Sequence, residues 1–184
     1  MPIPKKLLVV RHCQAHGQDS DAKLTPLGQQ QADVLASFLG QWPIERIVSS
    51  PFVRAVQSIT PLARSRNLCI ETDERLVERI LGSPTTDWLE RLRATFEDLD
   101  LRLPGGESSR EGMIRARAAV DDILLKNAST TVVVTHGNLM ALLLKHFTDR
   151  FGFADWRSLT NPDVYAISID ARGTSVVRVW GRGG

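Results

Sequence analysis

Basic and imidazole side chains follow three short β-prone runs of the sequence. They are Arg11 and His12 after residues 7–10, Arg54 after residues 44–50, and His136 after residues 131–135. Ligands bind at the carboxyl ends of the strands in open α/β sheets, so we expect these side chains to meet at one edge of a sheet. Arginine offers a planar fork of N–H donors that matches phosphate oxygens, and a histidine ring nitrogen can act as a nucleophile. The pattern therefore predicts a site for phosphate or a similar oxyanion.

Each of these residues has a simpler interpretation when it is taken alone. A strand-end histidine can be a hydrogen-bonded core residue, and an arginine such as Arg11 can be a solvated surface charge. A metal cluster of His12, Cys13 and His16 is a further alternative, but these residues share one loop and lack an accompanying carboxylate or second Cys/His pair. Because the candidate residues follow three separate strands, we favour the oxyanion site, with no metal ion and no other cofactor.

The strands that would position this site are four β-prone runs. They lie at residues 7–10, 44–50, 68–72 and 131–135. The first run is continuously apolar, which is typical of a strand buried on both faces of a parallel sheet. A helical pattern follows each run, and this alternation predicts an α/β fold. Alternating apolar and polar residues at 164–169 and 175–180 predict an edge hairpin.

Capping residues mark where the helices begin. Thr25 and Pro26 predict an N-cap and a first helical position, for a helix that ends near Gly40. Ser50 and Pro51 repeat this pattern and predict a second helix, whose free N–H groups would lie beside the site. Further helices are expected at 88–99, from 108 or 109 to about 126, and at 137–147.

Composition and charge exclude several classes of protein. The 184 residues are 42% hydrophobic and 24% charged, with a net charge of +2, as in one soluble globular domain spanning residues 1–184. The charges alternate in sign, so no nucleic-acid partner is expected. Cys13 and Cys69 form no disulfide or zinc pattern, and no apolar run resembles a signal peptide or a membrane span. We expect a cytoplasmic protein without membrane contact, with a frayed tail at 181–184.

Between residue 7 and about residue 145 the chain contains the segments LLVVRH, LTPLGQQQA, SSPFVRAVQS, LVERILG, PGGES and VVVTHG. In order and spacing these segments resemble the histidine phosphatase superfamily, in its phosphoglycerate mutase-like branch. The resemblance implies a single-domain, three-layer α/β/α sandwich with a mostly parallel sheet and helices on both faces. It also implies a metal-independent reaction in which a histidine carries the phosphoryl group.

The resemblance assigns roles by motif position. His12 corresponds to the nucleophile that becomes phosphohistidine, and His136 corresponds to the second histidine of the pocket. Arg11 and Arg54 correspond to the arginines that clamp the phosphate. Gly137 would join Arg11, Arg54 and His136 in binding the substrate.

Glu78, in the segment LVERILG, matches the acidic proton donor of the family. Glu74, Glu90 and Glu107 are neighbours that could take this role instead. Glu107, in PGGES, is a family landmark as well. We interpret Glu107 as a helix-start carboxylate that complements the helix dipole, with at most an indirect part in the pocket.

The loop after His12 departs from the family pattern. Where the family has glycine, an acidic residue and threonine, this chain has Cys13, Gln14 and Ala15. Gln18 stands where the family often has an asparagine that touches the phosphate, and we expect Gln18 to contact the substrate. Cys13 beside two arginines is either an oxidisable thiol or a small inert filler, and the filler is favoured.

The expected function is hydrolysis of a small phosphomonoester through phosphohistidine on His12, with Glu78 as proton donor. About thirty residues separate Glu78 from Glu107, whereas the mutases of the family tend to carry longer segments that exclude water. The short segment favours a phosphatase over a mutase. A non-catalytic phosphate-binding module is the third alternative, which the altered loop favours. The expected partner is the small phosphorylated substrate, and the sequence specifies no oligomeric state.

Overall fold

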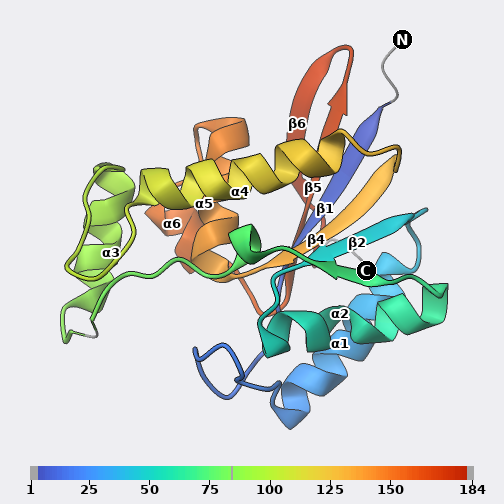
Figure 1. The fold of residues 1–184 in the computed structure, drawn as a ribbon, viewed down its shortest axis with the longest axis horizontal. Coiled ribbons are helices and arrows are strands. Elements are labelled where there is room, and N and C mark those ends of the chain that lie inside the picture. Colours follow the sequence, from blue (N-terminus) through green and yellow to red (C-terminus); the bar gives the residue numbers. More distant parts are fainter. Residues whose placement is uncertain (1–3, 84, 182–184) are drawn as a thin grey trace.

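Six strands form one sheet in the computed structural model, which describes residues 4–83 and 85–181 (Figure 1). They are β1 (Lys5–Arg11), β2 (Arg46–Ser49), β3 (Ile70–Thr72), β4 (Thr130–Thr135), β5 (Asp163–Asp170) and β6 (Gly173–Arg178). Their order across the sheet is β3-β2-β4-β1-β5-β6. The first four strands are parallel to one another, while β5 runs antiparallel to β1 and β6 runs antiparallel to β5.

The helices lie on both faces of this sheet (Figure 1). They are α1 (Pro26–Leu39), α2 (Val53–Arg66), α3 (Trp88–Glu97), α4 (Ser109–Leu124), α5 (Gly137–Thr148) and α6 (Phe153–Arg157), with a 3₁₀ turn, η1, at Glu74–Leu76. One core lies between the sheet and α1 and α2, and a second core lies between the sheet and α3, α4 and α5. The fold is therefore the expected three-layer α/β/α sandwich.

Strand β1 shows why the sheet is covered on both sides. Leu7 and Val9 pack into the core formed with α4 and α5, whereas Leu8 and Val10 pack into the core formed with α1 and α2. All four side chains are at most 1% exposed. Successive residues of a strand point to opposite faces, so a continuous apolar run requires apolar partners on both sides.

The predicted helix starts are confirmed at α1, α3, α4 and α5, and side-chain caps hold two of them. The Thr25 side chain accepts a hydrogen bond from the Gly28 N–H at the start of α1, next to Pro26. Ser108 caps α4 by accepting from the N–H of Glu111, whose carboxylate in turn accepts from the N–H of Ser108. Each cap satisfies backbone donors that the first helical turn leaves unpaired.

The predicted start of α2 is wrong. The helix begins at Val53, with Phe52 as its N-cap residue, instead of beginning at Ser50 and Pro51. The backbone N–H of Ser50 donates to the carbonyl of Val134 and so extends the sheet pairing by one residue beyond β2. The Ser50 hydroxyl is thereby placed inside the fold, away from the helix start.

Smaller differences concern the strand ends and two short elements. Strands β2 and β3 are shorter than the runs that predicted them, and α6 and η1 have no counterpart among the predicted elements. In the predicted edge hairpin only β6 is an edge strand, because β5 pairs with β1. Pro84 and residues 182–184 of the expected frayed tail lie outside the described residues. Among the helices of the described ranges, none is long and apolar enough to cross a membrane.

Candidate active site

His12 follows β1 at the carboxyl edge of the sheet and is 7% exposed. Its Nδ1 atom lies 2.6 Å from the carbonyl oxygen of Cys13. A carbonyl can only accept, so Nδ1 carries the ring proton and the lone pair of a neutral ring belongs to Nε2. Burial lowers the pKa of His12 to about 4. The positive charges of Arg54 and Arg11 also lower this pKa, whereas the hydrogen bond to Cys13 raises it. His12 is therefore neutral near pH 7.

Arg54 lies in the first turn of α2 and is fully buried. Its Nη1 atom donates to the carbonyl oxygens of Gln18 and Asp19, at 3.0 and 2.7 Å, and its Nε atom donates to Nε2 of His12 at 3.3 Å. The guanidinium carbon lies 4.9 Å from the centre of the Phe52 ring. The remaining nitrogen, Nη2, is buried without a hydrogen-bond partner in the described chain.

Arg11, the last residue of β1, lies against the first residue of α5. Its Nη1 atom donates to the carbonyl of Leu159 at 3.0 Å. A Cβ atom on Gly137 would lie 3.0 Å from the Cζ and Nε atoms of Arg11, a tight contact that would require the guanidinium to shift. The missing side chain of Gly137 thus leaves the space that the guanidinium occupies. Within the described residues, Nε of Arg11 is buried and unpaired.

His136 follows β4 and is fully buried. Its ring centre lies 5.0 Å from the ring centres of both His12 and Phe52. Nε2 lies 2.8 Å from the hydroxyl oxygen of Ser50, whereas Nδ1 is buried with no partner in the described part of the chain. Burial, reinforced by the neighbouring His12 and Arg54, holds the pKa of His136 well below its usual range. His136 is therefore a neutral ring.

Glu78 lies at the N-terminus of α5, the helix that begins directly after His136. One carboxylate oxygen accepts from the N–H of Leu139 at 3.0 Å and from the N–H of Arg79 at 2.9 Å, and the other accepts from the N–H of Asn138 at 3.1 Å. The first N–H groups of a helix have no partner within the helix and favour negative charge. They fix the carboxylate in one orientation beside the pocket.

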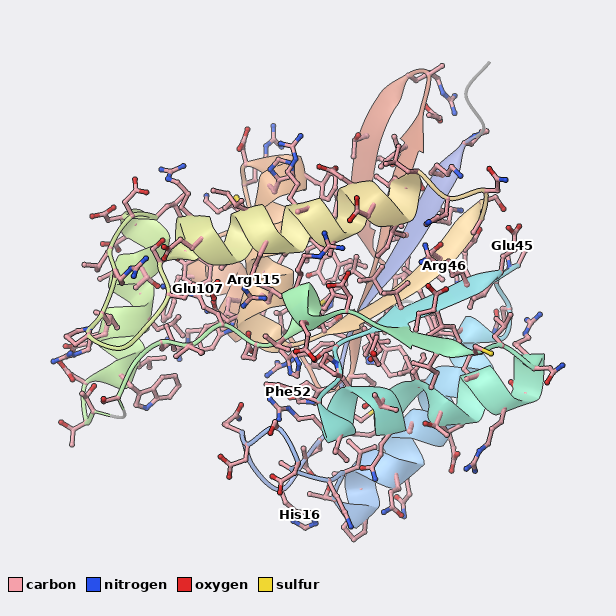
Figure 2. The ribbon with its side chains drawn as sticks, in the orientation of Figure 1. His16, Glu45, Arg46, Phe52, Glu107 and Arg115 are labelled. Carbon is pink, nitrogen blue, oxygen red and sulfur yellow. The ribbon has the colours of Figure 1, made fainter. Side chains whose placement is uncertain are left out.

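Glu107 has a different role from the one expected at the helix start. Ser108 is the N-cap residue of α4, and the acidic residue of its first turn is Glu111. The Glu107 carboxylate instead accepts two hydrogen bonds from Arg115, at 2.6 and 2.9 Å, and the two side chains point toward one another in Figure 2. Arg115 also donates to the carbonyls of Arg75 and Val77. Arg115 thus ties α4 both to Glu107 and to the segment that leads to Glu78.

The loop after His12 contributes its backbone more than its side chains. Gln18 is exposed and reaches the cluster through its carbonyl oxygen, which binds Arg54. His16 is exposed as well and lies at the lower edge of the molecule in Figure 2. Cys13 is fully buried and its backbone N–H donates to Ser58. Burial raises the pKa of its thiol to about 11, which supports the interpretation of Cys13 as an inert filler.

The sequence reasoning missed three polar side chains near the site. Ser50 contacts His136 through its hydroxyl, and the amide of Asn161 donates to the carbonyl of His12 at 2.7 Å. Asn138 is 5% exposed, and neither atom of its amide has a partner in the described ranges. Ser50 follows the parallel strand β2, but its sequence context favours a helix cap instead of a contact with His136. Asn161 precedes the antiparallel β5, whose amino end lies at the same edge of the sheet because Asp163 pairs with Arg11.

The structure thus brings His12, Arg11, Arg54, His136 and Gly137 together, with Glu78 at the same helix start. Three buried nitrogens of this cluster lack a partner within the described ranges, namely Arg11 Nε, Arg54 Nη2 and His136 Nδ1. An anion with several oxygens can accept hydrogen bonds from such groups while facing Nε2 of His12. No group of three or more His, Cys, Asp or Glu side chains in the described residues is arranged to hold a metal ion.

Comparisons with known proteins agree with this geometry. The family model of the histidine phosphatase superfamily (branch 1) matches residues 7–181. The chain is 33% identical to "Probable phosphoglycerate mutase GpmB" of Yersinia enterocolitica, over 71% of this chain and 65% of that protein. It is 28% identical to a bifunctional protein of Mycobacterium tuberculosis, over 96% of this chain and 53% of that protein. The chain therefore spans less than two thirds of the length of either relative.

A solved structure matches the chain over nearly its whole length. It is a mycobacterial glucosyl-3-phosphoglycerate phosphatase in complex with inorganic phosphate. The two chains share 27% sequence identity and superpose with a TM-score of 0.79, over 97% of this chain and 98% of the other.

Proposed function

Because the chain belongs to the histidine phosphatase superfamily, we propose that it hydrolyses a small phosphomonoester through a phosphohistidine intermediate on His12. The observation that carries this proposal is the environment of Nε2 of His12. This atom holds the lone pair of a neutral ring and faces Arg54, and the His136 ring lies 5.0 Å away. Arg11, Arg54 and His136 each keep a buried nitrogen without a partner in the described chain. The mycobacterial relative of known structure is a phosphatase, which supports hydrolysis.

In the first half of the reaction, Nε2 of His12 attacks phosphorus. The new P–N bond forms as the P–O bond to the leaving group breaks. Arg11, Arg54 and His136 donate hydrogen bonds to the phosphoryl oxygens, where charge accumulates in the transition state. Glu78 acts as the general acid in this step and gives a proton to the leaving alkoxide.

In the second half, water attacks the phosphohistidine. Glu78, now a carboxylate, takes a proton from the water as the new P–O bond forms. The P–N bond breaks and returns the electron pair to Nε2 of His12. Inorganic phosphate then leaves and Glu78 is again protonated. Acid and base roles reverse between the two halves, so one carboxylate serves both. The positive charge comes from two arginines, and no step needs a metal ion.

A mutase is the second candidate function, since one relative is named a phosphoglycerate mutase. The phosphohistidine would then be attacked by a hydroxyl group of a second substrate instead of water. Both candidates use the same first half-reaction. They differ in whether inorganic phosphate is released, which is directly measurable. A non-catalytic phosphate-binding module would use neither step.

The deciding experiment is release of inorganic phosphate from an aryl phosphate and from a panel of sugar and alcohol phosphates, with and without a chelator. His12→Gln keeps a polar side chain of similar size but lacks a nucleophilic ring nitrogen. His16→Gln is the matched control, because His16 is an exposed histidine of the following loop. We expect release in the wild type and in His16→Gln, with or without chelator, and none in His12→Gln.

A rapid quench with substrate labelled in the phosphoryl group tests the intermediate. We expect label on the wild-type protein that is stable in base and lost in acid, as a phosphoramidate bond is. Phosphate transfer between substrates without net release would favour the mutase. Equal activity of the His12→Gln variant and the wild type would overturn the proposal.

A further inference from the structure

The Ser50 hydroxyl lies in the pocket but takes no part in the proposed reaction. Ser50 follows the last residue of β2 and is fully buried. Its hydroxyl oxygen lies 2.8 Å from Nε2 of His136. Serine before proline commonly caps a helix, but α2 begins three residues later, and within the described chain its N-cap makes no side-chain hydrogen bond. The hydroxyl therefore does not serve as the N-cap of α2.

The neighbours of this hydroxyl determine where its proton lies. The oxygen accepts a hydrogen bond from the N–H of Phe52 at 3.3 Å. Among the described residues its other hydrogen-bonding neighbour is Nε2 of His136. A serine hydroxyl has one proton to donate, and a buried donor is normally satisfied. The proton therefore points to Nε2, which must then be the unprotonated nitrogen of the neutral His136 ring.

We propose that Ser50 is a positioning residue that holds His136 in the tautomer with its proton on Nδ1. Nδ1 is the ring nitrogen without a partner in the described chain, and the ring lies 5.0 Å from that of His12. In this tautomer His136 donates a hydrogen bond to an anion bound at His12. In the other tautomer a lone pair would face that anion and repel it. The catalytic consequence rests on the proposed function, whereas the tautomer itself does not.

The ring is held in this orientation from a second side. The Phe52 ring meets the His136 ring at an interplanar angle of 66° and packs against Arg54. The position of the His136 ring thus depends on contacts with both Ser50 and Phe52, which lie in one segment. Two buried groups of that segment, a hydroxyl and an aromatic ring, fix the hydrogen bonding and the plane of one imidazole.

The first test needs no substitution at Ser50. Nitrogen NMR of the full chain labelled with ¹⁵N-histidine distinguishes the protonated from the unprotonated ring nitrogen. The chain has four histidines, and the His136 signals are identified by their absence in His136→Gln. We expect a protonated Nδ1 and an unprotonated Nε2 at neutral pH. A protonated Nε2 in the wild type would overturn the proposal.

Variants test the origin of the tautomer and its effect on anion binding. Ser50→Ala should shift His136 toward protonation at Nε2 and raise the Kd for inorganic phosphate by about tenfold, because one hydrogen bond to a charged group is lost. Ser50→Thr keeps the hydroxyl and should restore both properties. Ser49→Ala is the matched control, since Ser49 is equally buried but donates to the carbonyl of Ser50. It should change neither property.

The outcomes separate this inference from the proposed function. If phosphate binds and the variants behave as expected but no substrate is hydrolysed, the function fails and the role of Ser50 in binding stands. If Ser50→Ala leaves both the tautomer and the Kd for phosphate unchanged, the inference fails whatever the activity. If Ser49→Ala and Ser50→Ala shift both properties equally, the effect is general loosening and the inference fails as well.

Discussion

The Nε atom of Arg54 lies 3.3 Å from Nε2 of His12, and the same guanidinium is held by two backbone carbonyls of the loop after His12. A fixed positive charge beside a ring nitrogen disfavours protonation of that nitrogen. The arginine thereby helps to keep His12 neutral, and its orientation does not depend on a ligand. The nucleophile and one of its phosphate-binding groups are thus arranged in advance.

Arg54→Lys should lower kcat/KM by about a hundredfold, the usual loss when one group that stabilises a transition state is removed. Lysine keeps the charge but cannot bind two carbonyls, His12 and a phosphate oxygen from one rigid plane. Steady-state kinetics measure the loss, and amide hydrogen exchange of residues 14–24 should increase. Arg64→Lys, in the last turn of the same helix, is the control. A normal kcat/KM in Arg54→Lys would contradict this account of the clamp.

Gly137→Ala should weaken the binding of inorganic phosphate by about tenfold. The added methyl group would lie about 3 Å from the Arg11 guanidinium and push it from its place on α5. Isothermal titration measures the change in Kd. Gly17→Ala is the control, because a Cβ there meets its nearest neighbour at 4.0 Å. Equal affinity of Gly137→Ala and the wild type would show that Arg11 can move without cost.

The free energy of unfolding should fall as the pH drops from about 6.5 to about 4. In this range the unfolded chain protonates His12, while the folded chain, with the pKa of His12 lowered to about 4, does not. The unfolded state therefore gains protons first, and stability decreases by about 3 kcal/mol across the range from this residue alone. His136 acts in the same direction.

Urea unfolding at a series of pH values measures this dependence. The slope should be smaller in His12→Gln, which cannot take up the proton in either state. His16→Gln serves as the control, because that side chain is exposed in the folded protein. An unchanged slope in His12→Gln would mean that burial does not perturb His12 in this way.

Glu107→Gln should lower the free energy of unfolding by about 2 kcal/mol, because it removes the charge from a partly buried, doubly hydrogen-bonded ion pair. The Glu107 and Arg115 side chains are 21% and 22% exposed. Glu97→Gln breaks the exposed pair with Arg93 and should change stability by less than about 0.5 kcal/mol. Thermal and urea unfolding provide the measurements. Similar effects of the two substitutions would show that the Glu107 pair is no more than a surface contact.

The sequence indicated the parts of the fold that depend on local chemistry. The apolar run of β1, the Thr25 cap and the start of α4 near Ser109 are each confirmed. Their contacts lie within a few residues of the chain or across a buried face of the sheet. The start of α2 was mispredicted because Ser50 has two possible uses. Its backbone N–H pairs with Val134 of the neighbouring strand, and this pairing competes with capping. The capping preference of serine cannot predict that pairing, because Val134 is distant in the sequence.

The candidate site was predictable where side chains follow parallel strands. His12, Arg54 and His136 were selected because three strands end at one edge of the sheet, and the structure brings them together. The ion pair of Glu107 with Arg115 was not predictable from spacing. Arg115 also binds the carbonyl of Arg75, and a contact between segments so far apart in the sequence depends on the tertiary fold. Asn161 was missed because the sheet position of an antiparallel strand depends on its partner.

The carbonyl oxygens of Gln18 and Asp19 hold Arg54 by the backbone alone. Every amino acid has the same backbone carbonyl group, so the orientation of this arginine does not depend on which side chains the loop carries. The residues that would meet a leaving group can therefore be exchanged one by one while the phosphate-facing groups remain in place. This independence gives a physical reason why the unusual Cys13-Gln14-Ala15 loop is compatible with an intact cluster, and it makes the same loop a practical place to redesign substrate preference.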